Sequence, residues 1–160
     1  MPQITLRPLH PDDIPTLYAH QSDRDASQMA VATPRDWPTY TAHVAKVMVD
    51  PEVHTRAILL DSVVVGQVSK FMLDGQPSVG YRIAKEYWGK GIASEALALL
   101  LQEVTLRPLH ARAARSNVAS IRVLEKCGFT VTHYAMSTST ERFPACEEAF
   151  LILNAHTQPE

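Results

Sequence analysis

Residues Glu86 to Leu97 read EYWGKGIASEAL and place two glycines and a small residue at alternate positions, Gly89, Gly91 and Ala93. A leucine-rich segment follows at once. Glycine disfavours helix and permits unusual backbone conformations, whereas alanine favours helix. The stretch therefore predicts an irregular loop that runs straight into a helix. Such a loop either only turns the chain or seats an anion on its bare backbone.

An anion in this loop would meet the backbone N–H groups of Gly89 to Ser94 at the positive end of the following helix. Lys90 would add a positive charge nearby. The Walker pattern does not fit, because it needs Ser or Thr directly after the lysine, where this chain has Gly91. A dinucleotide fingerprint also fails, since its third glycine is missing. From these residues alone, the turn and the anion site both stay open.

A second informative segment is NVASIRVLEKCGF, from Asn117 to Phe129. Three apolar residues at helical spacing form one stripe: Ile121, Leu124 and Cys127. Gly128 followed by a hydrophobic residue is typical of a helix end. Asn117 and Ser120 lie three residues apart and so share one face of the helix start. By themselves, these two residues predict a helix cap.

Together the two segments resemble the GNAT superfamily of acetyl-CoA-dependent N-acetyltransferases, and most closely its branch of ribosomal-protein N-terminal (alanine) acetyltransferases. In that branch the cofactor loop commonly reads YWGKGIATEA, against YWGKGIASEA here. The second motif reads N-x-x-S-x-x-x-x-E-K-x-G-F, against NVASIRVLEKCGF here. The preceding VGYRI also fits. The resemblance extends over residues 4–154. The wider superfamily usually has Gln or Arg at the position of Trp88, but tryptophan is normal in this branch.

The resemblance implies acetyl-CoA as the donor and assigns a set of cofactor-binding residues. The strand backbone at Tyr81, Arg82 and Ile83 would pair with the pantetheine arm. Asn117 would hydrogen-bond the pantetheine, and Ser120 would lie near the sulfur. The cofactor loop opens with Trp88, and the residues that would cradle the pyrophosphate are Gly89, Lys90, Gly91, Ile92, Ala93 and Ser94.

The implied reaction is direct attack of a neutral amine on the thioester carbonyl. It needs positioning, a stabilised oxyanion, removal of the amine proton and protonation of the leaving thiolate. A backbone N–H near Ile83 is the implied oxyanion donor. Many members protonate the thiolate with a tyrosine in the second motif, where this chain has Leu124. Ser120 is the expected replacement, and a simple capping role is the alternative.

The sequence identifies the general base less clearly than the donor site. The predicted strand at 78–84 carries no carboxylate, so Glu141 is the expected catalytic residue on the acceptor side. His133, Tyr134 and Asp74 are alternatives that are equally compatible with structural roles. At pH 7 an α-amine with a pKa of about 7.8 is about 14% neutral, against about 0.04% for a lysine. This gap of about 3.5 kcal/mol lets an α-amine react with a weak base and a water relay, which favours an N-terminal or other low-pKa amine.

Three alternatives differ from this prediction, two in function and one in mechanism. A non-catalytic acyl-CoA binding or sensing domain on the same fold is the main alternative, supported by the missing tyrosine and the undefined base. A nucleotide-phosphate-binding protein is disfavoured by the failed Walker pattern. Cys146 could accept an acyl group, but no histidine lies near it in sequence to activate it.

The composition is that of an ordinary globular protein and predicts one acetyltransferase-like domain over residues 1–160. Of the 160 residues, 46% are hydrophobic and 20% charged, with a net charge of −2. Without a basic cluster we expect no nucleic-acid partner, and the longest aliphatic run, at 96–101, is too short for a membrane span. The absence of a signal peptide and of a cysteine framework predicts a cytoplasmic protein. The histidine spacing predicts no metal, and the family resemblance allows a homodimer.

Apolar periodicity predicts strands at 4–9, 53–60, 63–72, 78–84, 109–115, 130–136 and 148–153, with a hairpin turn at Asp61-Ser62. It predicts helices at about 12–22, 39–49, 91–106 and 119–126. This order indicates a mixed α/β fold around one sheet. The resemblance specifies an α/β (α+β) GNAT-like fold with a mostly antiparallel sheet of about six to seven strands and helices on both faces. Two polar segments, 23–38 and 137–144, are expected to be loops that border the acceptor site.

Overall fold

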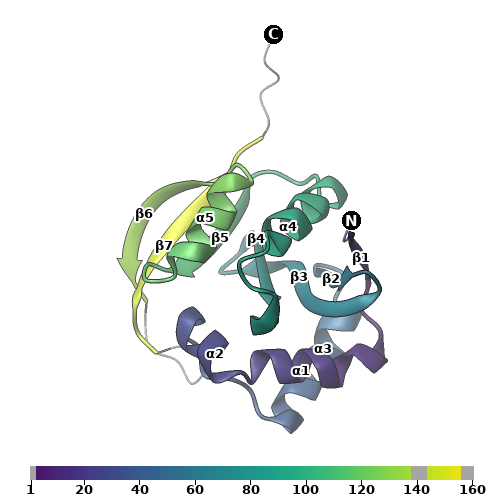
Figure 1. The fold of residues 1–160 in the computed structure, drawn as a ribbon. Helices are drawn as coiled ribbons and strands as arrows, with labels where there is room; N and C mark the ends of the chain where they lie inside the picture. Colours follow the sequence, from purple (N-terminus) through teal and green to yellow (C-terminus); the bar gives the residue numbers. More distant parts are fainter. Residues whose placement is uncertain (1–2, 138–143, 156–160) are drawn as a thin grey trace.

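A computed structural model of the chain describes residues 3–137 and 144–155. At its centre is a sheet of seven strands in the order β1-β2-β3-β4-β5-β7-β6 (Figure 1). The strands are β1 Ile4–Pro8, β2 His54–Leu60, β3 Val63–Leu73, β4 Gln76–Ile83, β5 Leu109–Ala114, β6 Thr130–Met136 and β7 Glu147–Leu153. The helices are α1 Ile14–Gln21, α2 Arg24–Ala30, α3 Trp37–Val49, α4 Ile92–Glu103 and α5 Val118–Lys126, with 3-10 turns at Pro11–Asp13 and Lys85–Tyr87.

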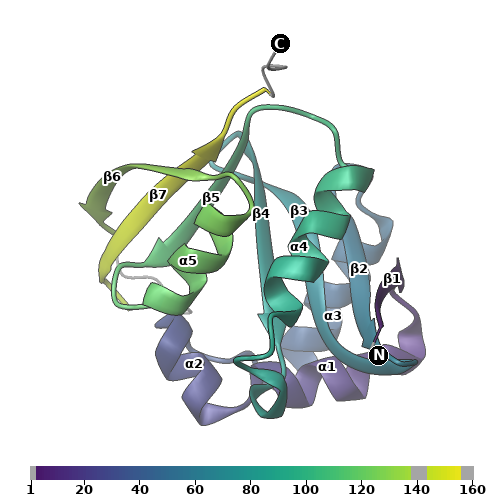
Figure 2. The same ribbon diagram turned by 45° about the horizontal axis from the view of Figure 1, so that its top comes forward.

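The junction between β4 and β5 interrupts an otherwise antiparallel sheet. These two strands run parallel, and they are in register only at Ser78 and His110, near the start of each strand. From there they diverge toward their C-terminal ends, as Figure 2 shows. Beyond Ser78, β4 therefore has no strand of the described chain paired to it on the β5 side. The backbone N–H and C=O groups along this edge of β4 are left without a ladder partner.

Helices cover both faces of the sheet (Figure 2). On one face, α4 and α5 enclose the main core, whose largest fully buried side chains are Ile58, Leu97, Leu100, Leu109, Leu151, Val65 and Val68. On the other face, α1 and α3 form a smaller core from Leu17, Tyr40 and Val44, with Val64 of β3 packed against it. The predicted fold, with its mostly antiparallel sheet and helices on both faces, is confirmed.

Most of the predicted elements are confirmed to within a few residues. Asp61 and Ser62 both have positive φ, at 50° and 77°, as expected of a two-residue hairpin turn. The helix predicted at 91–106 ends earlier, at Glu103. The predicted helix at 39–49 begins two residues earlier, at Trp37; Val44 on its inner face is buried, whereas Met48 is exposed.

The prediction of an irregular loop over residues 23–38 is wrong in its first half, where α2 forms. The Asp23 side chain accepts a hydrogen bond of 2.8 Å from the Ala26 backbone N–H and so caps the helix. Val31 ends it in the left-handed conformation, with φ of 52°. Only Ala26 and Ser27 of this short helix are buried. A polar helix with so narrow a buried face leaves no apolar stripe in the sequence.

Candidate active site

The open edge of β4 carries backbone groups that point into the gap between β4 and β5. The Ala84 N–H donates to the Val65 carbonyl of β3, at 2.8 Å. The Arg82 carbonyl also faces β3, because a Cβ added at Gly66 would lie 2.2 Å from it. Backbone direction alternates along a strand, so the N–H and C=O groups of Tyr81 and Ile83 point the other way, toward the gap.

Trp88 fastens the glycine loop to the end of this strand. Its indole Nε1 donates to the Ile83 carbonyl at 2.9 Å, while the ring remains 37% exposed. Gly89 and Gly91 have φ of 75° and 76°, in the left-handed region. A Cβ at either glycine would meet no atom within 4 Å. Backbone conformation therefore requires these glycines, and the space above them is open.

The helix that follows starts without a side-chain cap. Gly91 is the N-cap residue of α4, and no side chain accepts a hydrogen bond from the first turn. Ile92 is buried and anchors the turn in the core, with 5% of its surface exposed. The first N–H groups of a helix have no partner within the helix, and the helix dipole is positive there. The geometry thus suits an anion placed against Ile92 to Ser94.

The second motif lies across the gap, at the start of α5. The Asn117 side chain accepts a hydrogen bond of 3.2 Å from the Ser120 N–H and caps the helix. The Ser120 hydroxyl does not cap, because it lies 2.9 Å from the Tyr81 hydroxyl of β4. Burial raises the pKa of Tyr81, although the hydrogen bond to Ser120 opposes that shift. Leu124 is a core residue, with 2% of its surface exposed.

Glu141, the expected general base, lies outside the described residues. The three described alternatives, His133, Tyr134 and Asp74, do not gather at this gap. His133 stacks on Phe150 with ring centroids 4.4 Å apart, on the outer strands of the sheet. Two other residues are held by arginines: Tyr134 lies under the Arg115 guanidinium at 4.0 Å, and Asp74 accepts from Arg112 at 2.7 Å.

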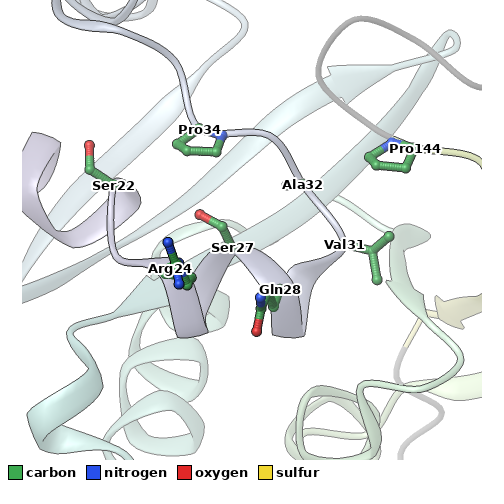
Figure 3. A pocket seen from close by; sticks show the side chains of 8 residues that line it. All are labelled: Ser22, Arg24, Ser27, Gln28, Val31, Ala32, Pro34 and Pro144. Atoms are coloured by element: carbon green, nitrogen blue, oxygen red, sulfur yellow. The ribbon is translucent and has the colours of Figure 1, made fainter.

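A cavity of about 520 Å³ lies next to α2, between this helix, the loop after it and Pro144 (Figure 3). The first polar segment expected to border the acceptor site and Pro144, the last residue of the second, thus line one cavity. Its described lining residues are Ser22, Arg24, Ser27, Gln28, Val31, Ala32, Pro34 and Pro144. Lys85, two residues after the end of β4, forms an ion pair with Asp25 of α2. This pair ties α2 to the end of the open strand.

Three side chains near the end of β4 were not anticipated as site residues: His20, Arg35 and the side chain of Arg82. The Nδ1 atom of His20 is buried, and in the described part of the chain it has no hydrogen-bond partner. Burial lowers the pKa of His20; the charge of Glu86 opposes this shift and that of Arg82 adds to it. His20 and Arg82 are far apart in the sequence, so no local pattern signals their proximity.

Among the described residues, neither cysteine is hydrogen-bonded to a histidine that could activate it. The Cys127 thiol donates to the Ser94 carbonyl at 3.5 Å, and burial raises its pKa, which disfavours the thiolate. Cys146 exchanges backbone and hydroxyl hydrogen bonds with Ser137. Within residues 3–137 and 144–155, no group of three or more ligating side chains is placed to hold a metal ion. Over the same ranges, every helix is too short or too polar to cross a bilayer.

Comparisons with known proteins agree on one family. The family model of the acetyltransferase (GNAT) domain matches residues 3–130. A protein described as an uncharacterized N-acetyltransferase p20 from Bacillus licheniformis is 24% identical in an alignment of 140 residues, which covers 79% of this chain and 79% of that protein.

Two solved structures illustrate the shared fold. Spermidine N-acetyltransferase from Vibrio cholerae, in complex with CoA and spermine, has a TM-score of 0.81 and 17% identity over 95% of both chains. Mycobacterium smegmatis RimJ, in complex with CoA-disulfide, has a TM-score of 0.77 and 21% identity, over 95% of this chain and 82% of its own.

Proposed function

The chain belongs to the GNAT acetyltransferase family, and we propose that it transfers the acetyl group of acetyl-CoA to a primary amine, by preference an α-amine at the N-terminus of a protein or peptide or on a small molecule. It is an N-acetyltransferase that uses acetyl-CoA as donor. Family membership removes most of the support for the alternative of a non-catalytic acyl-CoA sensor. What the proposal adds is the acceptor and the role of each residue.

The observation that carries the proposed site is the open edge of β4 beside an uncapped helix start. In this proposal the CoA pyrophosphate binds the backbone of Gly89 to Ser94, where the helix dipole and free N–H groups stabilise negative charge. The pantetheine arm runs along the open edge of β4 and is held by the Asn117 amide. The thioester then lies in the gap, where the Ile83 N–H stabilises the oxyanion.

We assign protonation of the leaving thiolate to Ser120. Its hydroxyl can accept a hydrogen bond from the Tyr81 hydroxyl and pass its own proton to the sulfur; the proton released by the amine then returns to the serine oxygen through water, so the serine ends the cycle as a hydroxyl. The Tyr81 pKa is raised, so the phenol is protonated at neutral pH and remains a donor. Tyr81 is thus a positioning residue behind Ser120. This arrangement replaces the tyrosine that many family members carry at the position of Leu124.

The preference for an α-amine rests on the weak base. Glu141 is our candidate for the carboxylate that takes the amine proton, directly or through water. An α-amine is neutral about 350 times more often than a lysine at pH 7, so it needs little assistance. The sequence likeness to the alanine acetyltransferase branch points the same way, and RimJ is one of the structural neighbours.

Binding and turnover test this proposal separately. In calorimetry, acetyl-CoA should bind far more tightly than ATP at equal concentration. Thiol release should then depend on an added amine, with N-terminal peptides ahead of their Nα-blocked, lysine-containing counterparts. Tighter binding of ATP would contradict the donor site. Acetyl-CoA binding with no thiol release for any peptide, polyamine or aminoglycoside would restore the sensor alternative.

A further inference from the structure

Arg82 lies on the face of β4 opposite to Tyr81. Side chains alternate along a strand, so Tyr81 faces α5 and the donor side, whereas Arg82 faces α1 and α3. Tyr81 packs against the main core, while the charge of Arg82 acts on Tyr40 of the smaller core and on His20 of α1. The end of β4 thus carries the open backbone edge proposed to bind the thioester and, on its other face, the half-buried guanidinium of Arg82.

Arg35 is held in place beside Arg82 by a buried glutamine. Gln21, with 3% of its surface exposed, accepts a hydrogen bond from the Arg35 N–H and donates one to the Arg35 carbonyl, each at 2.9 Å. This pair of bonds fixes the chain directly after Pro34, which lines the cavity next to α2. The Arg35 guanidinium is half-buried and shares Tyr40 as a neighbour with Arg82.

Neither of these two guanidinium groups is paired with a carboxylate among the described residues. The other partly buried arginines are bonded to acceptors: Arg7 to Asp13, Arg56 to Glu103, Arg112 to Asp74, and Arg107 to backbone carbonyls. Arg35 and Arg82 have neither an ion pair nor a side-chain hydrogen bond in residues 3–137 and 144–155. The neighbouring cavity adds Arg24 and has no carboxylate among its described lining residues.

Two like charges in a half-buried site are unfavourable unless an anion joins them. Burial lowers the pKa of both arginines, and the charge of Arg35 lowers that of Arg82 further. Arginine nevertheless stays protonated in proteins, so the cluster keeps its positive charge. Its planar fork matches a carboxylate with two parallel hydrogen bonds. Such a site is favourable only when it is occupied.

We propose that Arg35 and Arg82 bind a carboxylate carried by the acceptor amine. This inference rests on the proposed function, because it places the acceptor on the α1–α3 side of β4, with its amine at the strand edge. The phosphates of CoA are unsuitable occupants, since the glycine loop leads into α4 on the opposite face of the sheet. A polycation would be repelled here, so we expect spermidine to be a poor acceptor.

The first test measures anion binding without catalysis. Thermal unfolding of the apo-protein is followed with glutarate, with inorganic phosphate and with sodium chloride at equal ionic strength. Glutarate should raise the melting temperature in a saturable way, and Arg35→Gln/Arg82→Gln should abolish the rise. Arg122→Gln, an exposed arginine of α5, is the matched control and should keep it. An equal rise in all variants, or a rise with phosphate alone, would overturn the carboxylate site.

The second test compares acceptors on the unaltered protein. Dipeptides are set against their C-terminal amides, and peptides with Glu as the second residue against those with Gln, which separates a C-terminal carboxylate from an acidic side chain. In one of these pairs the carboxylate form should have about 10-fold higher kcat/KM, the range for a hydrogen-bonded charged group. Arg82→Gln should remove the preference through KM and leave acetyl-CoA affinity unchanged.

Equal or better turnover of the neutral partner in both pairs would overturn the inference. Failure of the proposed function looks different: no amine would release thiol at all, while the glutarate measurement would still decide whether the two arginines form an anion site. If the double variant fails to fold, Arg35→Gln alone serves in its place, and the acceptor comparison needs no variant.

Discussion

The hydroxyl of Ser120 lies 2.9 Å from that of Tyr81 and bridges α5 to the open strand. We expect Ser120→Ala to lower kcat on the order of 100-fold, the lower range for a lost general acid, with little change in acetyl-CoA affinity. Tyr81→Phe should lower kcat less, because the serine hydroxyl remains. Single-turnover kinetics and calorimetry together check this. A loss of affinity as large as the loss of rate would identify Ser120 as a binding residue only.

Asn117 has a structural role that must be separated from its proposed contact with pantetheine. Its side chain caps α5, so Asn117→Ala should cost about 1 kcal/mol of stability as well as cofactor affinity. Asn117→Ser keeps an oxygen for the cap but has no amide N–H to donate. If the contact is real, both variants bind acetyl-CoA more weakly and only the alanine variant melts earlier. Wild-type affinity in the serine variant would reduce Asn117 to a cap.

His20 makes stability depend on pH. Burial lowers its pKa in the folded protein below the unfolded value of about 6.5, so the unfolded chain binds the proton more readily. Stability is therefore complete above pH 6.5 and falls as the pH drops through the lowered folded pKa. Denaturant unfolding at pH 7.5 and 5.0 should show this loss, and His20→Gln should reduce it. If the unfolding free energy of the variant fell by the same amount between pH 7.5 and 5.0, His20 would not be the source of the pH dependence.

At the scale of elements, the loop and helix start carry the proposed donor site. Gly91→Ala places a side chain at φ of 76°, which costs about 1–2 kcal/mol, and puts a methyl group where the proposed pyrophosphate binds. We expect weaker acetyl-CoA binding and a lower melting temperature. Gly75→Ala, at the same φ of 76° in the β3–β4 turn, is the matched control. Gly75→Ala should lose the same stability and bind acetyl-CoA as tightly as the unaltered protein. Equal acetyl-CoA affinity in the two variants would contradict the proposed pyrophosphate site.

The elements of the donor side could be predicted because their signals are local. The loop, the α5 cap and the apolar stripe of α5 each fall within a few consecutive residues, and the family resemblance follows from them. The helix α2 was missed because its buried face is only two residues wide. The pairing of Ser120 with Tyr81 was missed because it joins residues 39 apart in sequence.

At the scale of the whole molecule, the divergence of β4 and β5 gives the site its geometry. The order of elements indicates one mixed sheet, but a sequence does not state where a parallel pair stops pairing. The cluster of Arg35, Arg82 and His20 is equally invisible in the sequence, because α1, the loop before α3 and β4 supply one residue each. The proposed donor-side residues face α4 and α5, and Arg35, Arg82 and His20 face α1 and α3. In our proposal, the open strand therefore separates the donor half of the site from the acceptor half.

This arrangement predicts that both substrates must be bound together before the acetyl group moves. Initial rates of thiol release, measured while acetyl-CoA and an accepted α-amine are both varied, test the claim most directly. We predict intersecting double-reciprocal lines and no acetylated protein, by mass spectrometry, when acetyl-CoA is added without the amine. Parallel lines, together with an acetyl group on Cys127 or Cys146, would show that the protein itself carries the acetyl group and would contradict direct attack.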